Sequence, residues 1–130
     1  MVAVGSNLLV MGGKYTPSIE VLKSPDGNWE YLRSFDKLKY GSKHFCAIAL
    51  TDHEFVVMGG TDNNDHINKK VAKYDMATPS ISDLADMPEA KFSHACARSG
   101  NLIYVTGGTN RHYTELDQGW KFLSCSHVKS

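Results

Sequence analysis

The sequence predicts an all-β fold made of a repeated four-stranded antiparallel sheet. Double glycines recur at Gly12-Gly13, Gly59-Gly60 and Gly107-Gly108, with spacings of 47 and 48 residues, and such a fixed period is typical of repeat folds. Each double glycine directly follows a short apolar segment of strand length. No apolar i, i+3, i+4, i+7 pattern continues for the roughly 10 to 12 residues that a helix needs.

The expected strands are rich in β-branched or aromatic residues and are bounded by Gly, Pro, Asn, Asp or Ser. In chain order, they are 7–11, 19–22, 29–32, 44–47, 54–58, 71–75, 81–84, 94–97 and 102–106. The segments 44–47 and 94–97 share a His-x-Cys-Ala pattern, and each lies 13 to 15 residues before a double glycine. Four short strands in about 48 residues are typical of one blade of a β-propeller.

The second repeat has a series of landmarks in a characteristic order. They are Gly59-Gly60, Tyr74-Asp75, Ile81, Leu84, Met87-Pro88, Lys91, His94-Ala95, Ile103-Tyr104-Val105 and Gly107-Gly108. This order resembles the kelch repeat, with Ile81 in place of the usual Trp and Lys91 in place of the usual Arg. The resemblance implies a β-propeller of the kelch type.

The first and third repeats depart from the kelch pattern in different ways. The first keeps Trp29 and His44 but has Leu22-Lys23 where Tyr-Asp is expected, and it lacks Met-Pro. The resemblance covers residues 1–108 and fades after Gly108. Beyond that point the strand candidates are Tyr113, Leu116 and Trp120.

The repeats predict a single kelch-repeat region, 1–130, with about three four-stranded blades. The expected blades are 1–36, 37–86 and a diverged 87–130. Propellers usually close with four to eight blades, so three blades form an incomplete ring with open edges. Three interpretations remain open: a fragment of a larger kelch protein, a ring completed by self-association, and a decayed copy that folds poorly.

Composition and charge argue against several classes of function. The 130 residues include 14 Lys+Arg and 14 Asp+Glu, and 42% are hydrophobic, as in an ordinary globular protein. A formal charge of zero gives no field that would attract nucleic acid or an anionic membrane. The longest apolar runs have four residues, far fewer than the roughly 20 of a membrane-spanning helix. Three cysteines and the absence of a secretory signal predict reduced thiols and a cytoplasmic location.

The double glycines are expected to be structural because residues without a Cβ accept positive φ at a crowded strand end. The sequence Gly12-Gly13-Lys14 lacks the other residues of a phosphate-binding loop. Asp62 to His66 resembles the start of a calcium loop but lacks the required Gly and Glu, so we expect a solvated loop.

The two His-x-Cys pairs are candidate zinc ligands by residue type. However, they occupy the same position in successive repeats and should lie on equivalent strands of different blades, without converging on one ion. No motif of a hydrolase, metalloprotease or dinucleotide-binding enzyme is present. We therefore expect no metal, no cofactor and no catalytic residues.

The connections between strands are the candidate binding site, because loops vary freely while the sheets hold their ends. In kelch propellers, by resemblance, the loops after the double glycines and those between blades line the same face. The candidate residues are Lys14, Tyr15, Lys39, Tyr40, Asn63, Asn64, Asp65, Lys91, Phe92, Asn110, Arg111 and His112. The resemblance implies binding of a partner protein through this face. The alternatives are a propeller enzyme of the kelch-like oxidase or sugar mutarotase type, and a component of a cytoskeletal or ubiquitin-ligase assembly.

Overall fold

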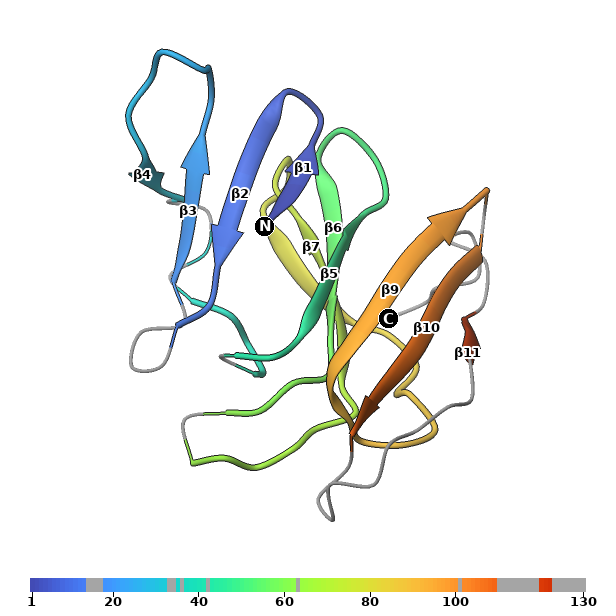
Figure 1. Ribbon diagram of the computed structural model, residues 1–130. Coiled ribbons are helices and arrows are strands. Elements are labelled where there is room, and N and C mark those ends of the chain that lie inside the picture. The colour runs from blue at the N-terminus through green and yellow to red at the C-terminus, as the bar shows by residue number, and fades with distance from the viewer. Residues whose placement is uncertain are drawn as a thin grey trace.

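The computed structural model describes residues 1–13, 18–32, 35, 37–41, 43–62, 64–100 and 102–109, and the backbone of 120–122. These residues form three small antiparallel sheets and no helix, which confirms the all-β prediction (Figure 1). Sheet I contains β1 (Val2–Val4), β2 (Asn7–Met11), β3 (Ile19–Leu22) and β4 (Glu30–Tyr31). Sheet II contains β5 (Cys46–Ala49), β6 (Glu54–Met58), β7 (Val71–Asp75) and β8 (Ser80–Asp83). Sheet III contains β9 (Phe92–Ser99), β10 (Leu102–Thr109) and β11 (Trp120–Phe122).

The strands next to the double glycines have the bounds that the apolar pattern predicts. β2, β3, β6 and β7 coincide with the expected segments, and β10 extends three residues further. β5 starts at Cys46, two residues after the expected His44, where the backbone has a positive φ of 59°. The candidates Tyr113 and Leu116 lie outside the described residues, whereas Trp120 begins β11.

The three sheets stack face to face in chain order, with sheet II in the middle (Figure 1). One apolar core lies between sheets I and II and includes Val4, Leu9, Val21, Phe55, Val57 and Tyr74. The second lies between sheets II and III and includes Val56, Met58, Val71, Leu84, Ile103 and Val105. Alternate residues of β6 therefore belong to different cores, which explains why this strand is buried on both faces.

Antiparallel strands direct the connections of each sheet to two opposite ends. We call the end with the β2–β3 and β6–β7 connections, which carry the double glycines, the glycine end. The segments that join one sheet to the next also meet there. The opposite end, here called the turn end, holds the β1–β2, β3–β4, β5–β6, β7–β8 and β9–β10 connections.

Gly59, Gly60 and Gly108 allow neighbouring backbones to approach closely at the glycine end. Gly59 and Gly60 have φ of 69° and 88°, and the other double glycines also have positive φ. A Cβ on Gly60 would lie 2.7 Å from the carbonyl oxygen of Lys43, and one on Gly108 would lie 2.9 Å from that of Phe92. Glycine is therefore required at these positions by backbone conformation and by space.

Candidate functional site

Three connecting segments come together at the glycine end, and we call their described residues the connecting face: 37–41 and 43–45, 59–62 and 64–68, and 85–93. Backbone hydrogen bonds join them. The Thr61 N–H donates to the Lys43 carbonyl (2.9 Å), and the Gly60 N–H donates to the Lys91 carbonyl (2.9 Å). The β6–β7 connection thus lies between the two segments that join the sheets, and the connecting face is built from both sides of sheet II.

The tip of the β6–β7 connection is an exposed polar turn. The Asp62 carboxylate accepts hydrogen bonds from the backbone N–H groups of Asn64 (2.8 Å) and His66 (2.9 Å). These bonds, that from His66 first, hold the pKa of Asp62 below its ordinary value. Asn64, Asp65 and His66 are all exposed. Among the described residues, no group of three or more His, Cys, Asp or Glu is placed to hold a metal ion.

An ion pair attaches this tip to the segment that precedes sheet II. The Lys43 Nζ lies 2.8 Å from an Asp65 carboxylate oxygen, and the Asp65 side chain remains 77% exposed. The backbone of Asp65 has a positive φ of 60°, which is uncommon for residues other than glycine. Asn64 and Asp65, both predicted to bind a partner, therefore lie together in an exposed turn that the Asp62 hydrogen bonds and the Lys43–Asp65 ion pair stabilise.

His44 and Phe92 meet where sheets II and III join. Their ring centroids are 5.9 Å apart, and the Ser93 N–H donates to the His44 carbonyl (2.9 Å). His44 is exposed and Phe92 is half-buried. The predicted residue Phe92 therefore contributes to the connecting face together with His44, which was predicted to lie in a strand.

Lys39 and Tyr40 are held at the edge of sheet II by Asp83, at the end of β8. The Asp83 carboxylate is 3.1 Å from the Lys39 Nζ, and its two oxygens accept from the Tyr40 hydroxyl at 2.9 and 3.0 Å. The bond from Lys39, followed by that from Tyr40, lowers the pKa of Asp83. The Lys70 Nζ lies 5.9 Å from the centroid of the Tyr40 ring. This cluster gives the connecting face a mixed cationic and aromatic edge.

Lys91 differs from the prediction. It was expected to point from a surface loop toward a partner, but its side chain is fully buried. Burial lowers the pKa of Lys91, and the nearby Glu89 carboxylate opposes that shift. The backbone of Lys91, through its bond from Gly60, belongs to the connecting face, whereas its ammonium group is not available to a partner.

The remaining predicted residues lie outside the described part of the chain. They are Lys14, Tyr15, Asn63, Asn110, Arg111 and His112.

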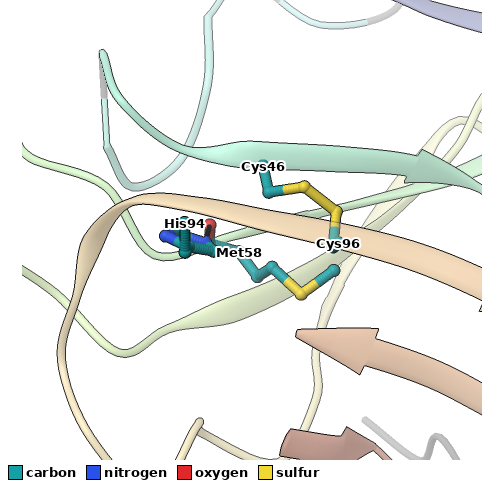
Figure 2. Close-up of a disulfide and its surroundings, with 4 residues drawn as sticks. All are labelled: Cys46, Met58, His94 and Cys96. Carbon is teal, nitrogen blue, oxygen red and sulfur yellow. Dashed lines mark hydrogen bonds between the residues drawn. A yellow bond between two sulfur atoms is a disulfide. The ribbon is translucent and has the colours of Figure 1, made fainter. Parts of the chain in front are cut away.

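The cysteines also differ from the prediction. Cys46 of β5 and Cys96 of β9 form a disulfide between sheets II and III, with their Cα atoms 6.1 Å apart (Figure 2). The two residues lie on different sheets, as expected, but their side chains converge and the expectation of two reduced thiols is wrong. Disulfides persist in oxidising compartments, so the argument from reduced thiols no longer supports a cytoplasmic location.

His94 is a structural histidine beside this disulfide (Figure 2). It is buried, and its Nε2 lies 2.9 Å from the carbonyl oxygen of Met58, which can only accept a hydrogen bond. Burial is the main cause that lowers the pKa of His94. The neutral ring with its proton on Nε2 therefore links sheet III to the end of β6.

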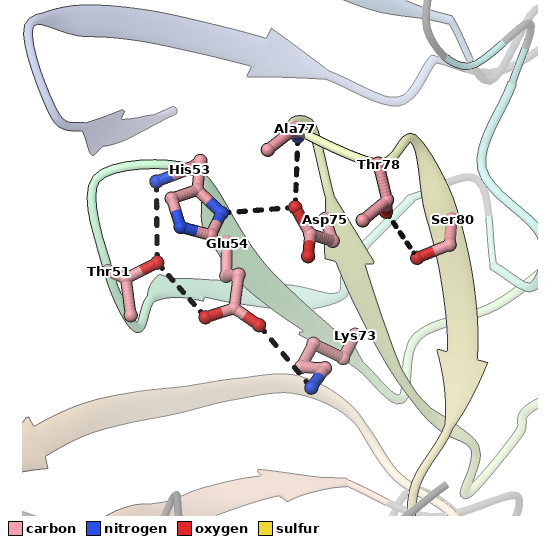
Figure 3. Close-up of polar contacts among 8 residues, drawn as sticks. All are labelled: Thr51, His53, Glu54, Lys73, Asp75, Ala77, Thr78 and Ser80. Atoms are coloured by element: carbon pink, nitrogen blue, oxygen red, sulfur yellow. Dashed lines mark hydrogen bonds and ion pairs between the residues drawn. The ribbon is translucent and has the colours of Figure 1, made fainter.

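The turn end of sheet II offers a comparison with the connecting face (Figure 3). The His53 Nδ1 and the Ala77 N–H both contact one carboxylate oxygen of Asp75, at 3.0 and 2.9 Å. Glu54 bonds to the Thr51 hydroxyl and pairs with the Lys73 Nζ at 3.3 Å. These polar groups are engaged with one another within two hairpins of one sheet. The connecting face, by contrast, combines segments from three places in the chain.

Two curated proteins are similar to this chain, and no family model matches it. The chain is 27% identical over 103 residues to Multiple epidermal growth factor-like domains protein 8 of Rattus norvegicus. It is 30% identical over 104 residues to Kelch-like protein 25 of Xenopus tropicalis. The matches cover 72% and 80% of this chain but only 4% and 17% of those proteins, so the chain spans less than a fifth of either.

The described residues contain no helix that is long and apolar enough to cross a membrane.

Proposed function

We propose that this chain is a kelch-type portion of a β-propeller and that its connecting face binds a partner protein. Sheets I, II and III are the blades in this proposal, and the double glycines let each blade accept the segments that join it to its neighbours. The similarity to a protein named Kelch-like protein 25 supports the kelch assignment. The stacking of the sheets in chain order supports the propeller assignment.

One observation carries the binding proposal: segments from three parts of the chain converge on the connecting face. They present an exposed polar tip at Asn64 and Asp65, an aromatic pair at His44 and Phe92, and a cationic edge at Lys39. Aromatic and adaptable polar side chains on a rigid support are the usual anchors of a protein interface. The proposal assigns no catalytic step to these residues.

The test compares the connecting face with the turn end. The face variant is Asn64→Ala with His66→Ala, which shortens two exposed side chains without changing a residue that has a positive φ. The control variant is Lys23→Ala with Thr78→Ala, two exposed residues at the turn end. Far-UV circular dichroism first establishes that both variants fold as the wild type does.

Affinity capture with quantitative mass spectrometry then identifies proteins bound by the wild-type chain and by each variant. We expect a partner that is retained by the control variant and lost by the face variant. Titration calorimetry with that purified partner should show affinity at least about tenfold weaker for the face variant, equivalent to about 1.4 kcal/mol. Equal affinity of both variants for the partner would contradict the proposed face.

A further inference from the structure

We propose that the Cys46–Cys96 disulfide is a reducible latch that holds sheet III against sheet II. The two cysteines are 50 residues apart in the sequence and belong to the first strands of neighbouring sheets. Their Cα separation of 6.1 Å is one that a disulfide spans without movement of the backbone. The bond therefore connects two units that otherwise meet through side-chain packing and a few hydrogen bonds.

Sheet III is held from one face only in the described part of the chain. Its inner face contributes Ile103 and Val105 to the second core. On the opposite face, Ala95, Ala97 and Tyr104 are exposed. Sheet II, in contrast, is covered on both faces. A sheet with a single packed face has fewer contacts that oppose its release, so loss of the latch should affect sheet III first.

Two polar side chains next to the latch, His94 and Arg98, hold sheet III to sheet II after reduction. His94 donates to the Met58 carbonyl, and the Arg98 guanidinium donates to the carbonyl oxygens of Ala49 and Leu50. These contacts keep the two cysteine side chains facing each other. The reduced state is therefore a loosened sheet III that can form the bond again.

The chemistry of the latch is thiol–disulfide exchange. Both cysteines are half-buried, and a small thiolate is the attacking group in such an exchange. A dithiol reductant attacks one sulfur to form a mixed disulfide, and its second thiol releases the reductant as a cyclic disulfide. Two electrons and two protons pass to the protein, which gains the Cys46 and Cys96 thiols. A dithiol oxidoreductase would supply the same chemistry in a cell.

The latch lies directly behind the connecting face. Cys46 follows His44 by two residues, and Cys96 follows Ser93 by three, while the Ser93 N–H donates to the His44 carbonyl. Reduction should therefore loosen the junction between the segments that precede sheets II and III. The latch is defined by the two sheets alone, so it stands even if the connecting face has no partner.

The experiment measures amide hydrogen exchange with and without dithiothreitol. It uses the full chain with Cys125→Ser, so that Cys46 and Cys96 are the only cysteines. We expect reduction to accelerate exchange in β9 and β10 by about 100-fold or more, the size expected when a disulfide closing a long loop is lost. Exchange in β2, which belongs to sheet I, should change little.

The matched control is Cys46→Ala with Cys96→Ala in the same background. Its β9 and β10 amides should exchange as fast as those of the reduced protein and should not respond to dithiothreitol. Three results would each overturn the inference. They are two free thiols in the unreduced, denatured protein, equal exchange of β9 before and after reduction, and equal acceleration of β2 and β9.

Discussion

Gly60 is the position where a single methyl group should do the most damage to the glycine end. Its φ of 88° lies outside the region that alanine readily adopts. A Cβ there would also lie 2.7 Å from the Lys43 carbonyl oxygen and 2.8 and 2.9 Å from the Cβ and backbone nitrogen of Phe45. None of these atoms can move without moving the backbone, so Gly60→Ala must displace the segment before sheet II.

The size of the effect follows from comparison with Gly100. Gly100 also has a positive φ, 58°, but nothing lies within 4 Å of a Cβ built on it. Gly100→Ala should therefore lose only the conformational term, about 1–2 kcal/mol of the free energy of unfolding. Gly60→Ala adds overpacking against backbone, which typically costs about 1–3 kcal/mol more. The expected total for Gly60→Ala is about 2–5 kcal/mol.

The assay is urea unfolding followed by far-UV circular dichroism. The wild type and the two variants are compared in the same buffer, without reductant so that the Cys46–Cys96 bond stays intact. Both substitutions place alanine at a positive φ, so subtracting the loss of unfolding free energy in Gly100→Ala from the loss in Gly60→Ala leaves the cost of crowding at Gly60. Since the urea dependence scales with the area exposed on unfolding, its slope should be similar for all three proteins.

Equal destabilisation by the two substitutions would refute this reasoning. It would mean that the Lys43 and Phe45 backbone does not lie against Gly60 in solution, and that the connecting face is not assembled as described. A loss at Gly60 that exceeds the loss at Gly100 by at least about 1 kcal/mol supports the close approach of the two segments.

Three further measurements test the core and the surface. Burial lowers the pKa of His94 below 6.5, so as the pH falls the imidazole is protonated in the unfolded chain before it is protonated in the folded chain. The contribution of neutral His94 to the free energy of unfolding should therefore be fully present above pH 6.5 and be lost as the pH drops below it. Urea midpoints at about pH 7.5 and about pH 5.5 should differ less in His94→Gln than in the wild type. Tyr74→Phe removes the hydroxyl that accepts from the Lys39 N–H at 2.8 Å and should lower the free energy of unfolding by about 1 kcal/mol in urea titrations. In Asp62→Ala, amide exchange at Asn64 and His66 should accelerate while exchange in β6 stays unchanged.

Strand positions could be read from the sequence because each apolar run is short and ends in residues that interrupt a sheet. β6 shows this most clearly: Glu54–Met58 is bounded by Asp52-His53 on one side and by the double glycine on the other. The bounds of other strands, namely β4, β5, β8 and β9, differ from the predicted bounds by one or two residues. β5, for example, begins two residues after the predicted His44, whose backbone has a positive φ.

The disulfide could not be predicted by aligning the repeats, because the two strands differ by one residue in register. Cys46 pairs with Met58 in β6, whereas Cys96 pairs with Val105 in β10, and Met58 and Val105 are not equivalent positions relative to their double glycines. A shift of one residue turns a side chain to the other face of a sheet. Cys46 therefore faces sheet III while Cys96 faces sheet II, and the sulfur atoms meet.

The sequence did not show which segments of the connecting face lie against one another, because main-chain groups make the contacts between them. The bonds between Thr61 and Lys43, Gly60 and Lys91, and Ser93 and His44 all involve main-chain atoms. Such bonds require no particular side chain, except that Gly60 must lack one. The same main-chain contacts leave the Lys91 side chain buried and the Asn64 side chain exposed, and the type of a polar residue alone does not predict which of the two it will be. Since the frame is independent of the exposed side chains, they can change to suit a partner without loss of the fold.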